Sequence, residues 1–447
     1  MNYKKTLLTV VSGLILVGCG GGGAALPHAN ISVAGLAVGK SVTLGLVYTA
    51  NSTETAVTAS GTSAVSPDLV HGGYTVKVIR HPQRQLCRVV DGSSFEVSSA
   101  NVAVSVECHV TYLNDTGVTD TTTALSGVDG EFGRDAAVQR GESLDKIGGG
   151  KSGFDFTKIC ADGQPVSSTG VCKTQTYTNE WACTQDNVTR LMWDIRSFGA
   201  TDPVPAWSTS GPSTWCGVPT ENWRLPTVHE LISIVDSSFV GAGDTTAKVD
   251  ATYFPNIVGG IYRAGEKDFE NKDWYVDLQN YGTASITPTT GNVLYVAALQ
   301  DSRVNAGQDF TVTDDNSGQY VIVDGGRDLV WLFEKAPQAT TWAQALGAVT
   351  TVNSTSVGGH SDWRLPNKNE LDSLMDRTKA SPTVYAGMLN GVDQSVYSSA
   401  FWSNTKWFET ASVNVWRVDF TTGDITLEDG GVANARAVYV RNRVTAP

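Results

Sequence analysis

The residues with the clearest chemical potential in this chain are the run His229-Glu230-Leu231-Ile232-Ser233. The run begins like the HExxH motif, in which two histidines one helical turn apart bind zinc and the glutamate acts as a general base. Ser233 stands where the second histidine must be, so the metal site is incomplete. The chain also lacks a Gly-x-Ser-x-Gly elbow, and its six histidines are scattered. We therefore expect no enzyme activity, no bound metal and no cofactor.

Glu230 has a structural explanation, because the phrase around it occurs twice. Residues 222–231 read Asn-Trp-Arg-Leu-Pro-Thr-Val-His-Glu-Leu, and residues 362–371 read Asp-Trp-Arg-Leu-Pro-Asn-Lys-Asn-Glu-Leu. The Thr and Asn after each proline are good helix N-caps, and the glutamate three residues later completes a capping box. Each phrase therefore predicts an extended segment, a proline and a short helix, with the arginine paired to the glutamate. The residues that define this motif are Trp223, Arg224, Pro226 and Glu230, then Trp363, Arg364, Pro366 and Glu370.

More of the chain follows the same order. Residues 186–193 precede the first phrase as residues 324–331 precede the second, and both segments end in Leu-x-Trp. Downstream, the Trp-x-Val-Asp segment at Trp274 matches the one at Trp416. Three anchors in matching order predict two related domains, at residues 181–300 and 301–447, around two tryptophan-rich cores. A further capping box at Thr341 predicts a second helix in the later domain.

Sugar binding would need aromatic faces and amides on exposed loops. Trp402, Asn404 and Trp407 offer such groups, with the alternative that Trp402 belongs to the core. The Glu-Pro-Asn, Gln-Pro-Asp and Trp-Asn-Asp signatures of calcium-dependent lectins do not occur. The acidic run from Asp314 to Gly318 could bind calcium, but such a run is more often a solvated turn.

The N-terminus reads as a processing signal and not as part of the fold. Lys4 and Lys5 precede an apolar stretch that is too short to span a bilayer, and Leu16-Val17-Gly18-Cys19 resembles a bacterial lipobox. We expect residues 1–18 to be removed, Cys19 to carry the lipid, and residues 19–30 to form a Gly-rich tether. The absence of Asp after Cys19 favours the outer membrane, at its periplasmic face or at the cell surface.

Charge and cysteine content agree with an exported protein. The formal net charge is −13, and a strongly acidic chain without a basic run is a poor partner for nucleic acid. Apart from Cys19 the chain has an even number of cysteines, which predicts disulfides in an oxidising compartment. Nearest-neighbour pairing is the simplest of many connectivities. The candidates are Cys87, Cys108, Cys160, Cys172, Cys183 and Cys216.

Two segments precede the repeats. Residues 31–112 alternate apolar and polar residues in short runs separated by glycine turns, which predicts a small β-sandwich of immunoglobulin type. Residues 113–180 begin as a Thr/Asp/Gly linker and continue as a lead-in that we expect to pack on the first repeat.

The repeats resemble a known family. Trp-Arg-Leu-Pro-x-x-x-Glu-Leu, Phe401-Trp402-Ser403-Asn404-Thr405, Trp416 to Gly423 and the closing Val440-Arg441 resemble the Lcl C-terminal domain family, named after the head of a bacterial collagen-like adhesin. The first repeat departs from it, since residues 261–264 replace the Phe-Trp-Ser phrase and residues 294–297 replace the closing Arg phrase. The phrase is also similar to that of formylglycine-generating domains, which implies a C-type-lectin-like fold. The cysteine pair required by their chemistry is missing, because no cysteine follows Cys216.

The expected protein is therefore multidomain, with β and α+β parts: an N-terminal β-sandwich followed by two C-type-lectin-like domains. By analogy of fold, we expect a non-enzymatic surface lipoprotein that uses its paired head for adhesion or for binding a glycan or a surface protein. The alternative is a structural component of the envelope or of a surface appendage. The membrane contact would be the lipid anchor, and the sequence leaves the oligomeric state open.

Overall fold

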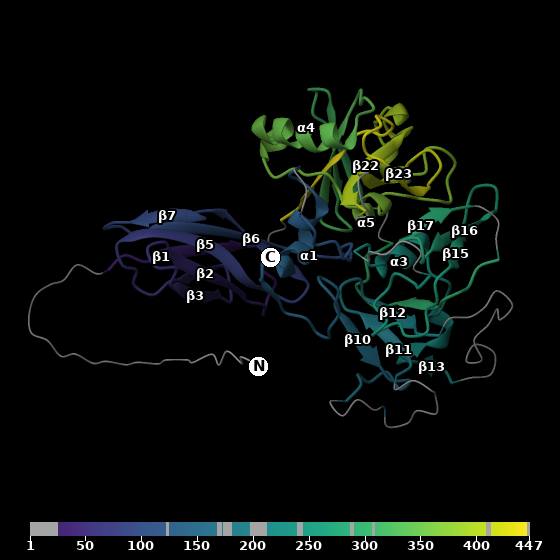
Figure 1. The fold of residues 1–447 in the computed structure, drawn as a ribbon, viewed down its shortest axis with the longest axis horizontal. Helices are drawn as coiled ribbons and strands as arrows, with labels where there is room; N and C mark the ends of the chain where they lie inside the picture. The colour runs from purple at the N-terminus through teal and green to yellow at the C-terminus, as the bar shows by residue number, and fades with distance from the viewer. Residues whose placement is uncertain are drawn as a thin grey trace, which may run out of the picture.

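The structure of the chain is a computed structural model that describes residues 26–121, 125–167, 172, 181–196, 212–238, 245–286, 290–305, 309–407 and 413–444. The expected signal segment 1–18, Cys19 and most of the tether lie outside these residues, so those expectations stay predictions. An N-terminal β domain lies at one end of the molecule and a larger head at the other (Figure 1). The predicted β-rich, multidomain class is confirmed.

The N-terminal β domain consists of two sheets around one core. The first sheet has the order β4 (Ser63–Val65), β1 (Ala29–Ala34), β8 (Val102–Val110) and β6 (Gln85–Asp91). The second has the order β3 (Glu54–Ala59), β2 (Val42–Tyr48), β5 (Gly72–His81) and β7 (Ser94–Val97). In β1 buried and exposed residues alternate strictly, because successive side chains of a strand point to opposite faces. β1 and β8 run parallel, so the first and last strands of the domain are hydrogen-bonded neighbours.

The lead-in connects this domain to the head. It contains a 3₁₀ turn (Asp129–Glu131), helix α1 (Gly133–Gln139) and the short strand β9 (Ser143–Leu144). β9 pairs in parallel with β5, so the lead-in extends a sheet of the β domain before the chain enters the head.

Two small antiparallel sheets in the head have the same arrangement. The first has the order β10 (Phe156–Ile159), β11 (Cys183–Asp186), β12 (Leu191–Asp194) and β18 (Val296–Ala298). The second has the order β19 (Phe310–Asp314), β20 (Gln319–Asp324), β21 (Leu329–Glu334) and β25 (Tyr439–Asn442). We refer to residues 156–298 as the first half of the head and to residues 310–442 as the second half. Because β10 pairs with β11, the first half begins within the expected lead-in.

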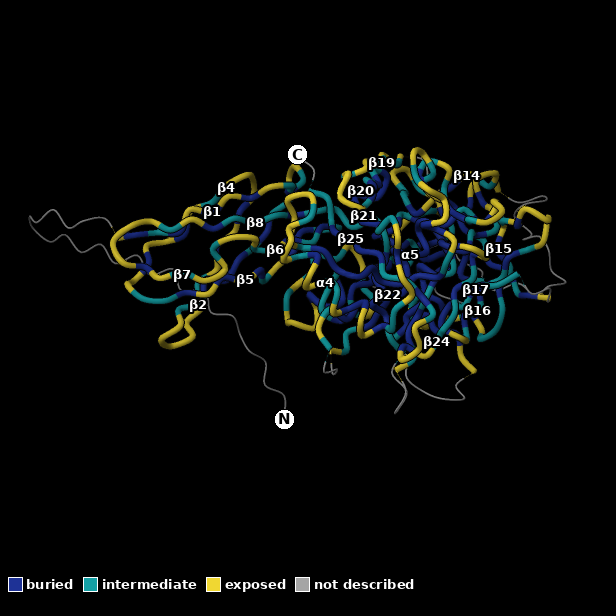
Figure 2. Tube along the Cα trace, turned by 90° about the horizontal axis from the view of Figure 1, so that it is seen from above, coloured by how far each residue is buried: buried dark blue, intermediate teal, exposed yellow. Residues whose placement is uncertain are grey.

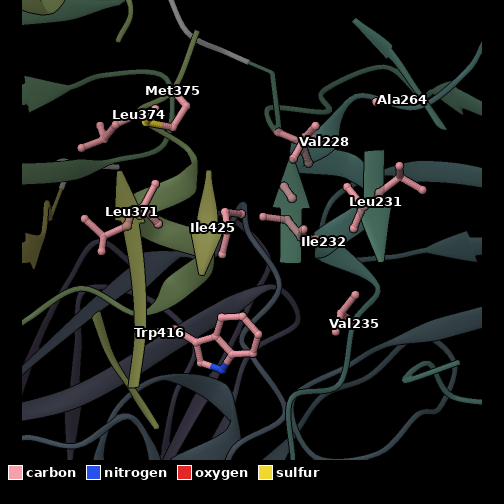
Figure 3. Packing of buried hydrophobic residues seen from close by; sticks show 14 of the residues in the cluster. Val228, Leu231, Ile232, Val235, Ala264, Leu371, Leu374, Met375, Trp416 and Ile425 are labelled. Atoms are coloured by element: carbon pink, nitrogen blue, oxygen red, sulfur yellow. The ribbon is translucent and has the colours of Figure 1, made fainter. Parts of the chain in front are cut away.

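A six-stranded sheet joins the two halves. Its order is β15 (Ile261–Lys267), β16 (Asp273–Asp277), β17 (Thr283–Ser285), β24 (Ile425–Asp429), β23 (Asn414–Asp419) and β22 (Ala400–Lys406). The halves meet where Ala284 of β17 pairs antiparallel with Ile425 of β24. The helices α3 (Val228–Ser233) and α5 (Lys368–Asp372) contact each other beside this joint, and their apolar side chains face one another with Ile425 between them (Figure 3).

One buried core is shared by the two halves of the head. A single buried cluster contains Trp193 and Trp274 of the first half together with Trp331 and Trp416 of the second. The buried segments fill the interior of the head in Figure 2. The expected pair of tryptophan-rich cores is therefore only part of the arrangement: each half has a cluster of its own, with Trp215 and Trp223 in the first and Trp342, Trp363 and Trp402 in the second, and the shared cluster lies between them.

The remaining sequence expectations for the fold are local. Helix α4 (Trp342–Ser354) begins at Thr341 with the predicted capping box to Gln344. The nearest-neighbour disulfides are confirmed as Cys87–Cys108, Cys160–Cys172 and Cys183–Cys216. No helix in the described parts of the chain is both long and apolar enough to cross a bilayer.

The β domain is fixed to the head by two carboxylates, each held between two arginines. Asp362 of the second half accepts from Arg88 of β6 at 2.7 Å and from Arg441 of β25 at 2.8 Å. Asp301, between the halves, accepts from Arg84 at 2.7 Å and from Arg190 at 3.1 Å. The β domain thus docks directly on the head.

Candidate functional site

Both copies of the repeated phrase form the predicted capped helix. Thr227 accepts from the Glu230 N–H and Asn367 accepts from the Glu370 N–H, while each glutamate accepts from the N–H of its own cap. Arg224 binds Glu230 through two hydrogen bonds of 2.7 and 2.6 Å. Arg364 binds Glu370 in the same way, with both distances at 2.6 Å. The predicted ion pairs are confirmed. The motif therefore fixes the backbone at the start of each helix.

The rest of the phrase holds each helix against the six-stranded sheet. The carbonyl of Pro226 accepts from the Gly265 N–H in β15, and that of Pro366 accepts from the Asn404 N–H in β22, both at 2.7 Å. Trp223 and Trp363 are buried. Their positions explain why the phrase recurs without a reactive group: it connects a strand to a helix in each half.

The expected sugar-binding residues do not form an exposed site. Trp402 and Asn404 are completely buried, and the Trp402 indole N–H donates to the Thr340 carbonyl at 2.8 Å. No aromatic face of Trp402 is accessible for a sugar to stack on, so the prediction is wrong for these two residues. Trp407 is half-buried and packs edge-on against Tyr281 of the first half, with ring centroids 5.8 Å apart.

The acidic run and the incomplete zinc motif are also structural. Lys335 pairs with Asp314, and Asp315 accepts from the Gln319 N–H at 2.9 Å. These contacts agree with the alternative that the acidic run is a solvated turn. Ser233 donates to the Glu230 carbonyl. Within the described ranges, no three His, Cys, Asp or Glu residues are grouped so that they could hold a metal ion.

The candidate site is a groove of about 640 Å³ between the two halves, which we call the open groove. Ligand pockets typically measure about 300–1,000 Å³, so its size suits a small ligand or a short peptide segment. The first half contributes part of its phrase and the end of β15, and the second half contributes the loop after α5. The lining residues are Arg224, Leu225, Thr227, His229, Gly265, Glu266, Asn305, Asp376, Thr378 and Tyr385.

The floor of the open groove is a rigid polar bridge between the halves. One ring nitrogen of His229 lies within hydrogen-bond distance of the Asp372 carboxylate, and the other lies 2.9 Å from the Met375 carbonyl. Arg377 donates to the other Asp372 oxygen at 2.6 Å. Burial alone would raise the pKa of Asp372, but Arg377 and His229 outweigh it and lower this pKa to about 2. His229 is therefore held by two partners from the second half.

The walls of the groove carry the groups that a ligand would meet. Glu266 accepts from the Val228 N–H through one oxygen at 3.0 Å. Asp376 accepts from the hydroxyl and N–H of Thr378 through one oxygen. Among the described residues, Asp376 has no cationic partner, whereas Glu266 lies in the field of Arg224, which is itself bound to Glu230. Burial raises the pKa of Tyr385 to about 12, so the phenol is neutral and can donate a hydrogen bond.

A second cavity of about 530 Å³ lies where the β domain, the lead-in and the second half meet. Its apolar lining includes Phe132, Leu346 and Val349. Its charged groups are already used, since Arg88 binds Asp362 and Glu107, and Arg364 binds Glu370. It is therefore a poorer candidate than the open groove.

Sequence reasoning identified the capped helices but missed the residues that join the halves. His229, Lys368, Asp372 and Arg377 are buried polar residues at that contact. Lys368 donates to the Tyr281 carbonyl at 2.7 Å and to the Ser237 hydroxyl at 2.9 Å. The available signal was the difference between the phrases, where Val228-His229 stands opposite Lys368-Asn369.

Comparison with known proteins adds one family to this description. No curated protein matches the chain. Residues 320–442 match the family model of the Lcl C-terminal domain, a span that runs from β20 to β25. The match therefore lies within the second half of the head.

Proposed function

We propose that this chain is a bacterial outer-membrane lipoprotein whose head binds a ligand, in adhesion or ligand capture, without catalysing a reaction. The observation that carries the proposal is the open groove, which lies at the contact between the halves and presents Glu266, Asp376 and Tyr385. The histidine and the glutamate of the first phrase are held by internal partners, so they are not positioned to act on a substrate. The two carboxylates and the phenol that line the groove are suited to binding a ligand through hydrogen bonds and charge.

We also propose that the first half is a second, divergent copy of the Lcl C-terminal domain. The same order of strands in the two small sheets and the same cap and proline contacts support this. The fold implied by the resemblance is C-type-lectin-like for both copies. The parallel pairing of β1 with β8 and the two-sheet core support an immunoglobulin-like assignment for the β domain.

Binding can be tested with the intact chain, purified in detergent, on glycan and peptide arrays. We expect a ligand whose signal is lost in Asp376→Asn, because the amide removes the charge and keeps the shape. Glu270→Gln is the matched control, since Glu270 is an exposed carboxylate paired with Lys272 outside the groove. Failure to find any ligand that depends on Asp376 would refute a binding role for the groove.

A structural role in the envelope is the alternative, and the docking of the β domain favours it. The Asp301 and Asp362 bridges hold the β domain against the head, as suits a fixed assembly unit. Protease treatment of intact cells separates the two functions. Digestion of the head on intact cells supports adhesion, whereas protection until the outer membrane is opened supports the structural role.

The lipid anchor has its own test. We expect Cys19→Ala to move the protein from the membrane fraction to the soluble fraction, because Cys19 would carry the only lipid. Fractionation followed by immunoblotting measures this, with Ser→Ala at Ser12 in the signal segment as a matched control. Retention of the Cys19→Ala chain in the membrane fraction would contradict the anchor.

A further inference from the structure

The two halves of the head make equivalent contacts around their phrases. The N–H of Val228 donates to Glu266, and the N–H of Lys368, which follows the second cap, donates to Thr405 at 3.0 Å. Glu266 follows the residue bonded to Pro226, just as Thr405 follows the residue bonded to Pro366. Glu266 and Thr405 therefore occupy equivalent positions.

The loops after the two helices are equivalent too. The Asp236 N–H donates to the Lys248 carbonyl at 2.8 Å, and the Asp376 N–H donates to the Thr383 carbonyl at 2.9 Å. Each carboxylate also accepts from the hydroxyl and N–H of the residue two positions later, Ser238 in one half and Thr378 in the other. Asp236 is thus the counterpart of Asp376.

The counterpart of the open groove is filled by the chain's own linker. Asn369 donates to the Asn114 carbonyl at 3.0 Å, and Asn367 donates to the Asp115 carboxylate at 3.0 Å. The Ser237 N–H donates to the Thr116 carbonyl at 2.7 Å. These contacts hold residues 114–117 as a buried peptide segment between the second phrase and the loop after α3, where the lead-in passes between the halves (Figure 1).

The filled groove also fits this segment closely. Gly117 has a positive φ of 83°, and a Cβ added to it would lie 2.2 Å from an Asp236 oxygen. Asp129, further along the lead-in, accepts from the Thr116 and Thr405 hydroxyls at 2.5 and 2.8 Å. Residues 114–117 thus lie against the wall at position 236, and Asp129 of the lead-in contacts the wall at position 405; these positions correspond to Asp376 and Glu266 in the open groove.

In the open groove only one described residue takes the place of this segment. Asn305 accepts from the Thr227 hydroxyl at 3.0 Å, as Asp115 accepts from Asn367 in the filled groove. Beyond Asn305 the space lined by Glu266, Asp376 and Tyr385 is the open groove itself.

The charges of the two grooves differ in a way that points to the occupant. In the filled groove, Lys151 of the lead-in binds the Asp236 carboxylate at 2.9 Å, and the opposite wall is the neutral Thr405. In the open groove, Asp376 has no cationic partner among the described residues, and Glu266 replaces the threonine. Two carboxylates that face a groove favour a cation, because like charges near one another are stabilised by an opposite charge between them.

We propose that the open groove binds an extended peptide segment of a partner protein that carries a lysine or arginine, in the manner in which the opposite groove binds residues 114–117. This inference rests on the proposed binding function and adds the chemical class of the ligand. The peptide backbone takes the place of the linker, and the basic side chain takes the place of Lys151 beside Asp376.

The probes for the test are labelled hexapeptides with the sequence of residues 114–119, each with a single lysine placed at one of the positions. A second set has glutamate at the same positions. Fluorescence anisotropy with the intact chain in detergent measures binding. We expect at least one lysine peptide to bind with a Kd of about 1 mM or below, and its glutamate counterpart to bind about tenfold or more weakly.

Variants of the groove connect this binding to the proposed residues. Asp376→Asn and Glu266→Gln keep the acceptors for Thr378 and Val228, so we expect each to weaken lysine-peptide binding about tenfold at an unchanged melting temperature. Thr378→Lys places a cation beside Asp376 within the chain, and we expect it to prevent binding. Glu270→Gln should leave binding unchanged.

The outcomes separate this inference from the binding function. It is overturned if no lysine peptide binds at about 1 mM, or if binding persists in both carboxylate variants. A glycan whose binding depends on Asp376, combined with no peptide binding, would overturn the peptide proposal and leave the binding function standing. If no ligand of either class depends on Asp376, both proposals fail.

Discussion

At the scale of single residues, the most unusual groups are buried carboxylates where the lead-in meets the head. Burial raises the pKa of Asp129 to about 8, and the neighbouring Asp115 carboxylate adds to the effect. Burial likewise raises the pKa of Asp115 and of Asp186 to about 6. A group without water to solvate its charge favours the neutral form. The protonated Asp129 therefore forms part of the folded structure at neutral pH.

This has a consequence for stability against pH. Between the ordinary Asp pKa of about 4 and the folded value of about 8, the folded state retains the Asp129 proton and the unfolded state does not. The contribution of Asp129 is therefore fully present at low pH and lost as pH rises through this window, by at most about 1.4 kcal/mol per pH unit. We expect Asp129→Asn to remove this decline. The melting temperatures of the unaltered chain and of the Asp129→Asn variant, measured from about pH 5 to about pH 9, test this expectation. Parallel curves of melting temperature against pH would contradict it.

The two capping glutamates differ in the cost of their removal. Arg364 and Glu370 have side chains only 9% and 10% exposed, whereas the Arg224 side chain is 41% exposed. Glu370→Ala leaves a buried unpaired arginine, so we expect it to lower the free energy of unfolding by about 3–5 kcal/mol. For Glu230→Ala, where water can reach Arg224, we expect a loss of about 1–2 kcal/mol from the cap. Urea unfolding measures both losses, and equal values would argue against this difference in burial.

At the scale of elements, the central feature is the joint between β17 and β24 with α3 and α5 beside it. The sequence predicted both helices correctly, because a capping box acts within four residues of the chain. It did not predict the joint, because the pairing of Ala284 with Ile425 depends on long-range contacts that no local pattern encodes. For the same reason His229 was considered only as part of an incomplete zinc motif, although its partner, Asp372, lies in the other half.

The joint makes a prediction about cooperativity. Ile425 is completely buried between the halves, so Ile425→Ala should cost about 2–5 kcal/mol through the cavity it leaves. Because the core is continuous, we expect amide exchange to accelerate in β16 of the first half as well as in β23 of the second. Val432→Ala, at a half-exposed valine of the second half, is the control. Acceleration confined to the second half would show that the halves unfold independently.

At the scale of the whole molecule, the β domain and the head form one connected body. Residue patterns predicted the strands of the β domain and the three disulfides, since alternation and cysteine spacing are local signals. They did not predict the docking, because no local pattern connects Asp301, or Asp362 at the start of the second phrase, with arginines of the β domain that lie far away in the sequence. The sugar-site prediction failed for a related reason. Tryptophan and asparagine are equally compatible with a surface loop and with a buried strand such as β22.

Removal of both bridging carboxylates should loosen the docking. In the Asp301→Ala, Asp362→Ala double variant, Arg84 and Arg88 of the β domain lose these partners in the head. We expect an increase in the radius of gyration by small-angle X-ray scattering, with a stability loss of about 3–5 kcal/mol, because Arg441, whose side chain is only 8% exposed, loses its partner Asp362. A variant at Asp273, which pairs with Lys267 on the surface of the head, serves as the control. Unchanged scattering from the double variant would mean that the remaining contacts, among them the pairing of β9 with β5, are sufficient to maintain the docking.

The parallel pairing of β1 and β8 determines how the molecule would respond to a pulling force. The chain enters the β domain at the start of β1 and leaves toward the head from the end of β8, and the two strands pair in register from Ala29–Val102 to Ala34–Glu107. A force between the N-terminus and a ligand held by the head would pull these strands in opposite directions along their length. All the hydrogen bonds of the pair then share the force and must break together, instead of opening one after another. A protein anchored at its N-terminus would thus resist detachment mechanically at the first element that the force reaches.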